Sequence, residues 1–131
     1  MVMSVKERTD TLEECYEFML AYAARGVPGE AGSSSDGRIR EFLRRALSAL
    51  DGLTESGRAA VQEQRREAVE KYEAFFEVLD RDARDSLASL DLVLAQPAIG
   101  SQMIDNLNGS IHLRALLTDL FLIGDILKPP R

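Results

Sequence analysis

Apolar residues recur three or four positions apart along most of the chain, the spacing that places them on one face of a helix. The first such stripe covers residues 12–23. Ser4 and Glu7 precede it with the spacing of a capping box, and the letters RGVP at 25–28 follow it, a combination typical of a helix end. The pattern predicts a first helix over residues 5–25.

The middle of the chain continues this periodicity. Ser35 or Asp36 is placed to cap a second helix, and Asp51 with Gly52 would end it. After this break the helical spacing resumes, with a strongly charged outer face rich in glutamate. We therefore predict that a third helix runs over 54–79.

The last part of the chain carries further helix boundaries. Asp80 or Asp82 could cap a fourth helix, and the Gln-Pro pair at 96–97 would stop it. A short helix is then expected over about 99–107. An Asn-Gly turn follows, and Ser110 is positioned to cap the final helix.

No stretch alternates apolar and polar residues with the period of two that strands require. The sequence therefore predicts an all-α protein, a compact helical bundle of five to six helices that forms a single domain over 1–131. The loops are expected to be short except for 26–37, which reads GVPGEAGSSSDG and is typical of a flexible linker. Residues 128–131 are expected to form a C-terminal tail.

The final predicted helix is the most apolar part of the chain, with eleven apolar residues among the seventeen from Ile111 to Leu127. His112, Arg114, Asp119 and Asp125 interrupt it. A membrane span needs about 20 mostly apolar residues, whereas this helix would be roughly 25 Å long and charged. We therefore expect no membrane association.

A helix that is apolar on several sides is either the centre of a bundle or part of an interface. Both alternatives are open from the sequence. Because twofold self-association is the commonest oligomeric state, we predict a homodimer formed through this helix or through the apolar end of the first. The candidate interface residues are Leu113, Leu116, Leu117, Leu120, Phe121 and Ile123.

The overall charge narrows the possible partners. Aspartate and glutamate number 22 against 16 lysines and arginines, which gives a net charge of -6. Such a charge repels phosphate backbones, and the stretch 86–111, which could be drawn as a helix-turn-helix, has no basic residue between Asp85 and Gly109. No nucleic-acid partner is expected. The lone cysteine and the absence of an N-terminal signal pattern favour a cytoplasmic location.

One basic cluster stands out against this acidic background, on the predicted second helix. It could bind an anion or an acidic partner, since arginines one helical turn apart can clamp a carboxylate or phosphate. The alternative is pairing inside the molecule with the acidic third helix. The cluster consists of Arg38, Arg40, Arg44 and Arg45.

Few residues of this chain could support catalysis or metal binding through histidine or cysteine. The chain has one cysteine, Cys15, and one histidine, His112, which lie 97 positions apart. Zinc and di-iron sites need several such ligands close together, so we predict no metal and no cofactor. Cys15 lies on an apolar stripe, which indicates a core residue rather than half of a nucleophilic pair. The sequence therefore predicts no enzyme activity.

The function that fits these observations is a small helical interaction protein, such as an adaptor, an assembly factor or a regulatory subunit. It would contact itself or another protein through helix-helix packing. The alternative is a helical domain that binds a small ligand in an apolar pocket between helices. The aromatic residues that could line such a pocket are Tyr16, Tyr22, Phe42, Tyr72, Phe75 and Phe76.

Overall fold

The computed structural model describes residues 3–64 and 67–127 of the chain. Within these two ranges it contains six α-helices and no strand, which confirms the predicted all-α bundle. The predicted tail at 128–131 lies outside the described residues. The helices are α1 Val5–Ala24, α2 Ser34–Leu50, α3 Leu53–Glu63, α4 Val69–Leu94, α5 Ser101–Asn108 and α6 Ile111–Ile126.

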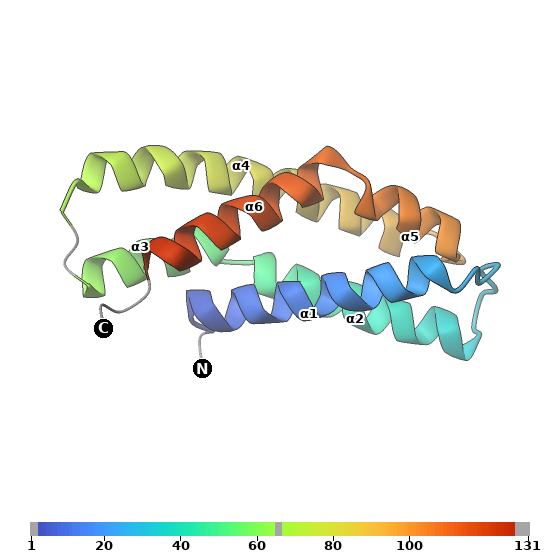
Figure 1. The fold of residues 1–131 in the computed structure, drawn as a ribbon. Helices are drawn as coiled ribbons and strands as arrows, with labels where there is room; N and C mark the ends of the chain where they lie inside the picture. The colour runs from blue at the N-terminus through green and yellow to red at the C-terminus, as the bar shows by residue number, and fades with distance from the viewer. Residues whose placement is uncertain (1–2, 65–66, 128–131) are drawn as a thin grey trace.

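The helices form an elongated bundle in which α6 crosses diagonally between α1 and α4 (Figure 1). Helix α1 packs mainly on α2 and on the short α5, whereas α4 packs on α6, α3 and α2. All six helices contribute to one apolar core. Its largest fully buried side chains include Met19, Tyr22, Ile39, Leu43, Leu53, Phe76, Leu79, Leu90, Ile104, Leu116 and Leu120.

Two helix starts are where the sequence predicts them. Ser4 and Glu7 form the expected capping box of α1, and Ser110 accepts a hydrogen bond from the Leu113 amide at the start of α6. The predicted cap of α2 is wrong, because Ser33 takes this role and accepts from the amide of Asp36. The Asp36 carboxylate is instead directed into the protein, where it has other partners.

The prediction of one helix over 54–79 is also wrong. Helix α3 ends at Glu63, and α4 begins at Val69 and continues to Leu94, so neither Asp80 nor Asp82 caps a helix. The chain folds back between α3 and α4, and the two helices lie side by side. This arrangement buries apolar residues from both segments in the same core, which a single straight helix of that length would not achieve.

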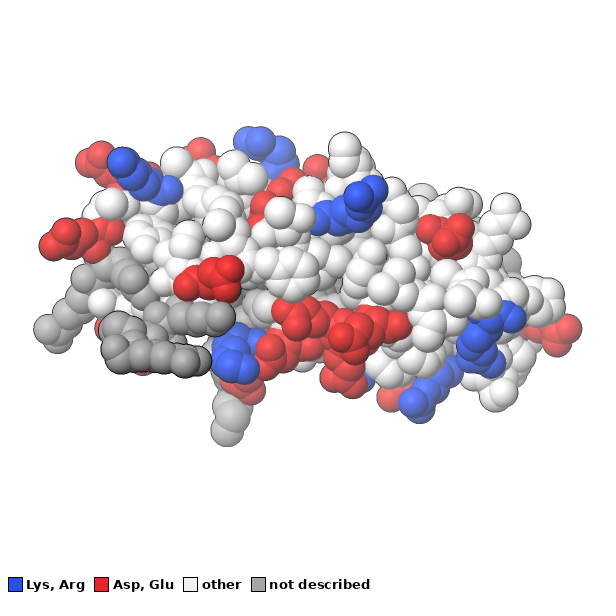
Figure 2. Space-filling model, in the orientation of Figure 1, with Lys and Arg blue, Asp and Glu red and all other residues white. Residues whose placement is uncertain are grey.

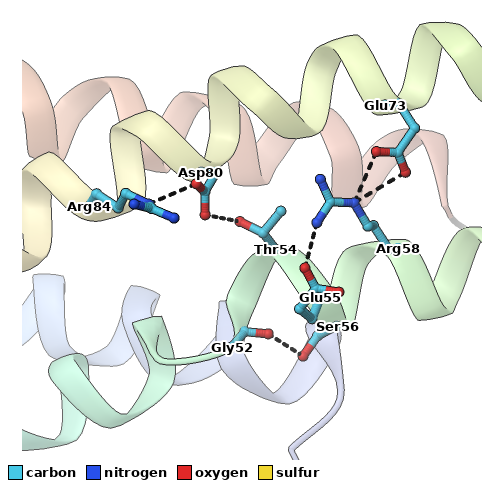
Figure 3. A network of polar contacts seen from close by, with 8 residues as sticks. All are labelled: Gly52, Thr54, Glu55, Ser56, Arg58, Glu73, Asp80 and Arg84. Atoms are coloured by element: carbon cyan, nitrogen blue, oxygen red, sulfur yellow. Dashed lines mark hydrogen bonds and ion pairs between the residues drawn. The ribbon is translucent and has the colours of Figure 1, made fainter.

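Polar contacts join α3 to α4 along this pair (Figure 3). Arg58 of α3 donates to both carboxylate oxygens of Glu73 at 3.0 and 3.1 Å. The Thr54 hydroxyl donates to Asp80 at 3.2 Å, and the other oxygen of Asp80 pairs with Arg84 at 2.8 Å. The aspartate proposed as a cap therefore links two helices instead.

The start of the Gly/Ser-rich linker is anchored by hydrogen bonds. The Val27 amide donates to Ser101 Oγ at 2.7 Å, and the Ser101 amide donates back to the Val27 carbonyl at 2.8 Å. Gly29 and Gly100 approach so closely that a Cβ on Gly29 would lie 2.8 Å from the Gly100 nitrogen. This anchoring, which the composition of 26–37 did not indicate, holds the α1–α2 connection against the start of α5.

Two buried or half-buried arginines complete the ends of helices other than their own. Arg8 of α1 donates to the carbonyls of Ser48, Ala49 and Asp51 at the end of α2. Arg40 of α2 donates to the carbonyl of Leu94, the last residue of α4, and to that of Gln96 just beyond the helix. The last carbonyls of a helix lack partners within it and carry partial negative charge, so these arginines both satisfy and attract them.

Among the residues that the structure describes, no helix is both long enough and apolar enough to cross a membrane.

Candidate functional site

A groove lies between the first half of α1 and the second half of α6. Its volume is about 520 Å³, and the floor is mostly apolar. Residues near the end of α3 close one side. The groove is lined by Val5, Lys6, Thr9, Asp10, Glu13, Ala60, Gln64, Leu120, Phe121, Ile123, Gly124, Asp125 and Leu127.

The groove exists because α1 has different neighbours along its length. Helix α5 packs against α1 but contributes nothing to the groove, whose described lining residues come from α1, from α6 and its end, and from the end of α3. The side of α1 that faces the groove carries Thr9, Asp10 and Glu13, which cannot form an apolar seam with α6. On α6, Gly124 has no side chain, and a Cβ built on it would meet no atom within 4 Å. The two helices therefore stay apart there.

Helix α6 buries most of the residues predicted to form an interface. Leu113, Leu116, Leu117, Leu120 and Ile123 are 0–6% exposed and fill the core of the single chain. A partner could reach these five side chains only by opening the bundle, so they form the core. Phe121, the sixth predicted residue, is 55% exposed and lines the groove.

The exposed apolar surface of α6 extends beyond the groove. Leu122 is 51% exposed and Ile126 is 41% exposed, in the same half of the helix as Phe121. Ile111, at the start of α6, is also exposed. Most surface positions of a monomeric protein carry polar residues, so several large apolar side chains together are typical of a contact surface.

The rim of the groove on the α1 side is acidic. Lys6 pairs with Asp10 at 2.8 Å, which leaves Glu13 without a hydrogen bond or ion pair to the described residues. Glu17 follows one turn later on the same face of α1 and is exposed. Figure 2 shows acidic side chains gathered over α1, beside an uncharged surface that extends toward α6. The groove therefore combines an apolar floor with a negatively charged edge.

The four arginines predicted to bind an anion or an acidic partner have separate surroundings. Arg40 is bound internally, to Asp36 at 2.8 Å and to the end of α4, so it cannot form a clamp with Arg44. Arg45 pairs with Glu14 of α1 at 3.0 Å, and its guanidinium also lies over the Phe42 ring. The intramolecular pairing that we considered is thus present, although its carboxylate comes from α1 rather than from the third helix.

The two remaining arginines of that cluster differ from each other. Arg38 lies over the stacked rings of Phe18 and Phe42, at 5.8 and 5.4 Å from their centroids. Arg44 is exposed and lines a shallow hollow between α1 and α2. The cluster therefore does not converge on one binding site.

The aromatic side chains proposed to line a ligand pocket do not surround the groove. Tyr22, Phe42 and Phe76 are buried in the core, and the remaining three pack against it from its edge. The Tyr22 hydroxyl donates to the Ile99 carbonyl at 2.6 Å, which fixes its orientation. Phe121 and not this aromatic set provides the ring at the groove.

Cys15 and His112 have different environments. Cys15 is 1% exposed, and burial raises the pKa of its thiol to about 11, so the reactive thiolate is scarce at neutral pH. His112 lies at the surface, with Nδ1 3.7 Å from the Asp85 carboxylate. No three histidine, cysteine or acidic side chains are grouped for metal binding within 3–64 and 67–127.

One carboxyl group has an unusual pKa. Burial and the neighbouring carboxyl of Asp82 on α4 raise the pKa of Asp119 to about 7. Asp119 Oδ2 is buried and accepts no hydrogen bond from the described residues. Asp119 lies on the opposite side of α6 from Arg114 and Asp125, and this side faces Asp82. The two carboxyl groups can share a proton there.

The sequence-based interface candidates include three residues that line the groove, Leu120, Phe121 and Ile123, but none of its residues from α1 or α3 and not Gly124. The signal that could have found the groove is the contrast within α1, whose first half is polar on a face that becomes apolar in the second half. Gly124 is a second signal, because a glycine inside an apolar helix often marks close approach or open space.

No protein-family model, no curated protein and no solved structure matches this chain.

Proposed function

We propose that this chain is a small helical interaction protein that binds apolar side chains of a partner in the groove between α1 and α6. One observation carries the proposal: Phe121 is 55% exposed beside an apolar groove, while its neighbour Leu120 is fully buried. Exposed aromatic residues next to a pocket are typical centres of protein interfaces.

Two kinds of partner are compatible with such a surface, and both follow from the proposal. A second copy of the chain could cover the exposed strip of α6 that contains Leu122 and Ile126. Another protein could insert a helix into the groove, as in helix-in-groove recognition. In either case, the protein would act as an adaptor, an assembly factor or a regulatory subunit rather than as a catalyst.

Measurement of the molar mass in solution, together with crosslinking at position 121, tests the proposal. Sedimentation of the wild type and of Phe121→Asp over a range of concentrations reveals self-association and its dependence on this residue. A photoreactive phenylalanine analogue at position 121 should give a discrete crosslinked product in the producing cell, whereas the analogue at the exposed Ala88 of α4 should not. A monomer that gives no product specific to position 121 would contradict the proposal.

A small apolar ligand is the alternative occupant, because the volume of the groove lies within the roughly 300–1,000 Å³ of known ligand sites. A ligand at 100 times its dissociation constant would add about 2.7 kcal/mol to the free energy of unfolding. Thermal unfolding with a panel of apolar metabolites would show this stabilisation, and Gly124→Gln should abolish it by filling the groove.

A further inference from the structure

We propose that the occupant of the α1–α6 groove is a positively charged amphipathic helix of a partner protein, whose apolar residues enter the groove while its lysines or arginines contact the acidic rim of α1. This inference rests on the proposed function and adds the chemistry of the partner. Three properties support it: the length of the groove, its charge and the lack of a matching basic and apolar surface on the described residues 3–64 and 67–127.

The length of the groove suits a short helical segment. Its α1 side runs from Val5 to Glu13, which at 1.5 Å per residue corresponds to about 12 Å. Apolar residues at positions i, i+3, i+4 and i+7 of a helix span about 10.5 Å and form one continuous stripe. Among the groove-lining residues of α6, Phe121 offers them the accessible apolar contact, since it is 55% exposed whereas Leu120 and Ile123 are buried beneath it.

The charge of α1 selects a basic partner. The surface of α1 carries five acidic side chains against one exposed cation, Lys6, because Arg8 is buried and bound to backbone carbonyls. Asp10 offsets Lys6, and Glu14 pairs with Arg45. Glu13 lines the groove and Glu17 lies one turn beyond it on the same face of α1, and neither has an ion pair to any described residue. Cations flanking an apolar stripe would be attracted to this edge of the groove, whereas an acidic helix would be repelled.

A second copy of the chain fits the groove less well. Each copy has a net charge of -6, so two acidic surfaces would meet. Helix α2 is the most basic described helix, but its apolar face is buried, and Arg40 and Arg45 already have partners. The exposed strip of α6 carries Arg114 but also Asp125, and so has no excess of positive charge.

The test is selection from a displayed library of helix-forming peptides in which apolar anchors are fixed at i, i+3, i+4 and i+7 and the flanking residues vary among lysine, glutamate and glutamine. The full chain serves as the target. We expect the selected peptides to be enriched in lysine at the flanking positions and their affinity to fall as ionic strength rises. Binding measured by fluorescence anisotropy then compares three variants of the chain.

Gly124→Gln should reduce the affinity of selected peptides at least tenfold, since it fills the groove in a region where a Cβ meets no atom within 4 Å. The double variant Glu13→Lys, Glu17→Lys should reduce it on the order of tenfold, because four charge units change on the rim. Glu70→Lys, Glu77→Lys is the matched control: it changes the net charge equally on α4, away from the groove, and should leave the affinity within about twofold.

The two proposals fail in different ways. If no selected peptide loses affinity on Gly124→Gln or Phe121→Ala, the groove is not a binding site and the proposed function fails with it. The peptides could instead depend on these two residues and yet carry neutral or acidic flanking residues, or lose affinity equally with both double charge variants. Either result would mean that the groove binds a helix, and it would overturn the inference that this helix is positively charged. A wild-type dimer that Phe121→Asp separates would identify a second copy as the occupant and would also overturn it.

Discussion

The two ends of α1 have opposite surroundings. Around its second half, Met19 and Tyr22 are buried, and polar contacts bind the helix to α5 and to the loop that precedes it. Around its first half, one side packs on α2 and α3 while the other faces the groove. At the second half of α1, the Tyr22 hydroxyl donates to the Ile99 carbonyl and the Ser101 hydroxyl donates to the Tyr22 carbonyl, each at 2.6 Å. We call this half the closed end of α1 and the half beside the groove the open end.

Under the proposed function, this difference assigns stability to one half of α1 and partner binding to the other. The closed end contains buried polar groups whose partners are specific atoms, so its geometry is unique and a change there affects folding. On the groove side of the other half, the exposed Phe121 and the acidic side chains of α1 are not packed into the core of the described residues, so a change at those positions should affect folding little. We expect substitutions at the two ends to separate stability from binding.

The largest expected difference is between two neighbouring residues of α6. Leu120→Asp puts a carboxylate at a fully buried position of the core. The variant should not fold and should show no cooperative unfolding transition, because the free energy needed to bury an unpaired charge exceeds the net stability of most domains. Phe121→Asp, at a 55% exposed position, should change the free energy of unfolding by less than about 1 kcal/mol. Urea titrations followed by circular dichroism would measure both. Similar losses at the two positions would contradict the assignment of core and groove.

Two glycines within helices should respond in opposite directions to alanine. A Cβ on Gly57 of α3 would lie 2.8 Å from the ring of Phe76, which is fully buried and cannot move aside, so Gly57→Ala should destabilise the protein by about 1–3 kcal/mol. Gly124→Ala meets no atom within 4 Å and should stabilise it by about 0.5–1 kcal/mol, since alanine favours the helix. The midpoints of chemical unfolding give the signs. A destabilising Gly124→Ala would show that the groove is more closely packed than described.

The hydrogen bond at the closed end should contribute a smaller amount. Tyr22→Phe removes the donor to the Ile99 carbonyl and leaves that buried oxygen unsatisfied, for an expected loss of about 1–2 kcal/mol. Tyr16→Phe on the same helix is the control, because Tyr16 is half-buried and its hydroxyl has no hydrogen bond to the described residues. Thermal unfolding of both variants would detect the difference. Equal losses would mean that this contact does not hold the closed end.

Two further effects concern how the free energy of unfolding depends on pH. The pKa of Asp119 is raised to about 7 in the folded protein, whereas that of an unfolded aspartate is about 3.9. Between these values the folded state binds more protons, so stability should fall as pH rises from about 4 to about 7 and then level off. Asp119→Asn should remove this decline and leave the variant more stable than the wild type at neutral pH.

Asp36 provides the opposite case at the closed end. The hydrogen bond from Arg40 lowers the pKa of Asp36, so its contribution to stability is present above the unfolded pKa and is lost as pH falls through the folded one. Asp36→Asn should therefore weaken the protein at neutral pH and flatten the acid side of the curve. Unfolding free energies measured from acid to neutral pH would separate the two carboxylates, and parallel curves for both variants would contradict their assigned surroundings.

Much of the fold could be predicted from the sequence because the relevant signals are local. Capping residues such as Ser4 and Ser110 act within one turn, and a 3.6-residue period identifies a helix without knowledge of its neighbours. The boundary between α3 and α4 could not be found in this way. The residue before α4, Ala68, has a φ of 60°, and no glycine or proline marks the turn. Tertiary packing of the two helices determines it instead.

The site was less predictable than the fold, because it depends on what each helix leaves uncovered. The apolar stripe of α6 looked the same at Leu120 and Phe121 in the sequence, and only the arrangement of α1 and α4 distinguishes a buried from an exposed position. The arginines of α2 looked like one cluster, yet they bind atoms on different helices. The charge and hydrophobicity of a residue therefore indicate that it is a candidate for a binding site. Which atoms it contacts depends on how the helices pack.

Hydrogen bonds such as those of Arg40 and Val27 connect the two halves of the chain, before and after the α3–α4 connection, and determine whether each half can fold alone. A break between α3 and α4 would separate Arg40 from the α4 carbonyls that it binds, and Val27 from Ser101. Each fragment would lack groups that only the other supplies. Produced as separate chains, residues 1–64 and 67–131 should be poorly structured alone and should reassemble when mixed, as the complementary halves of a split protein do.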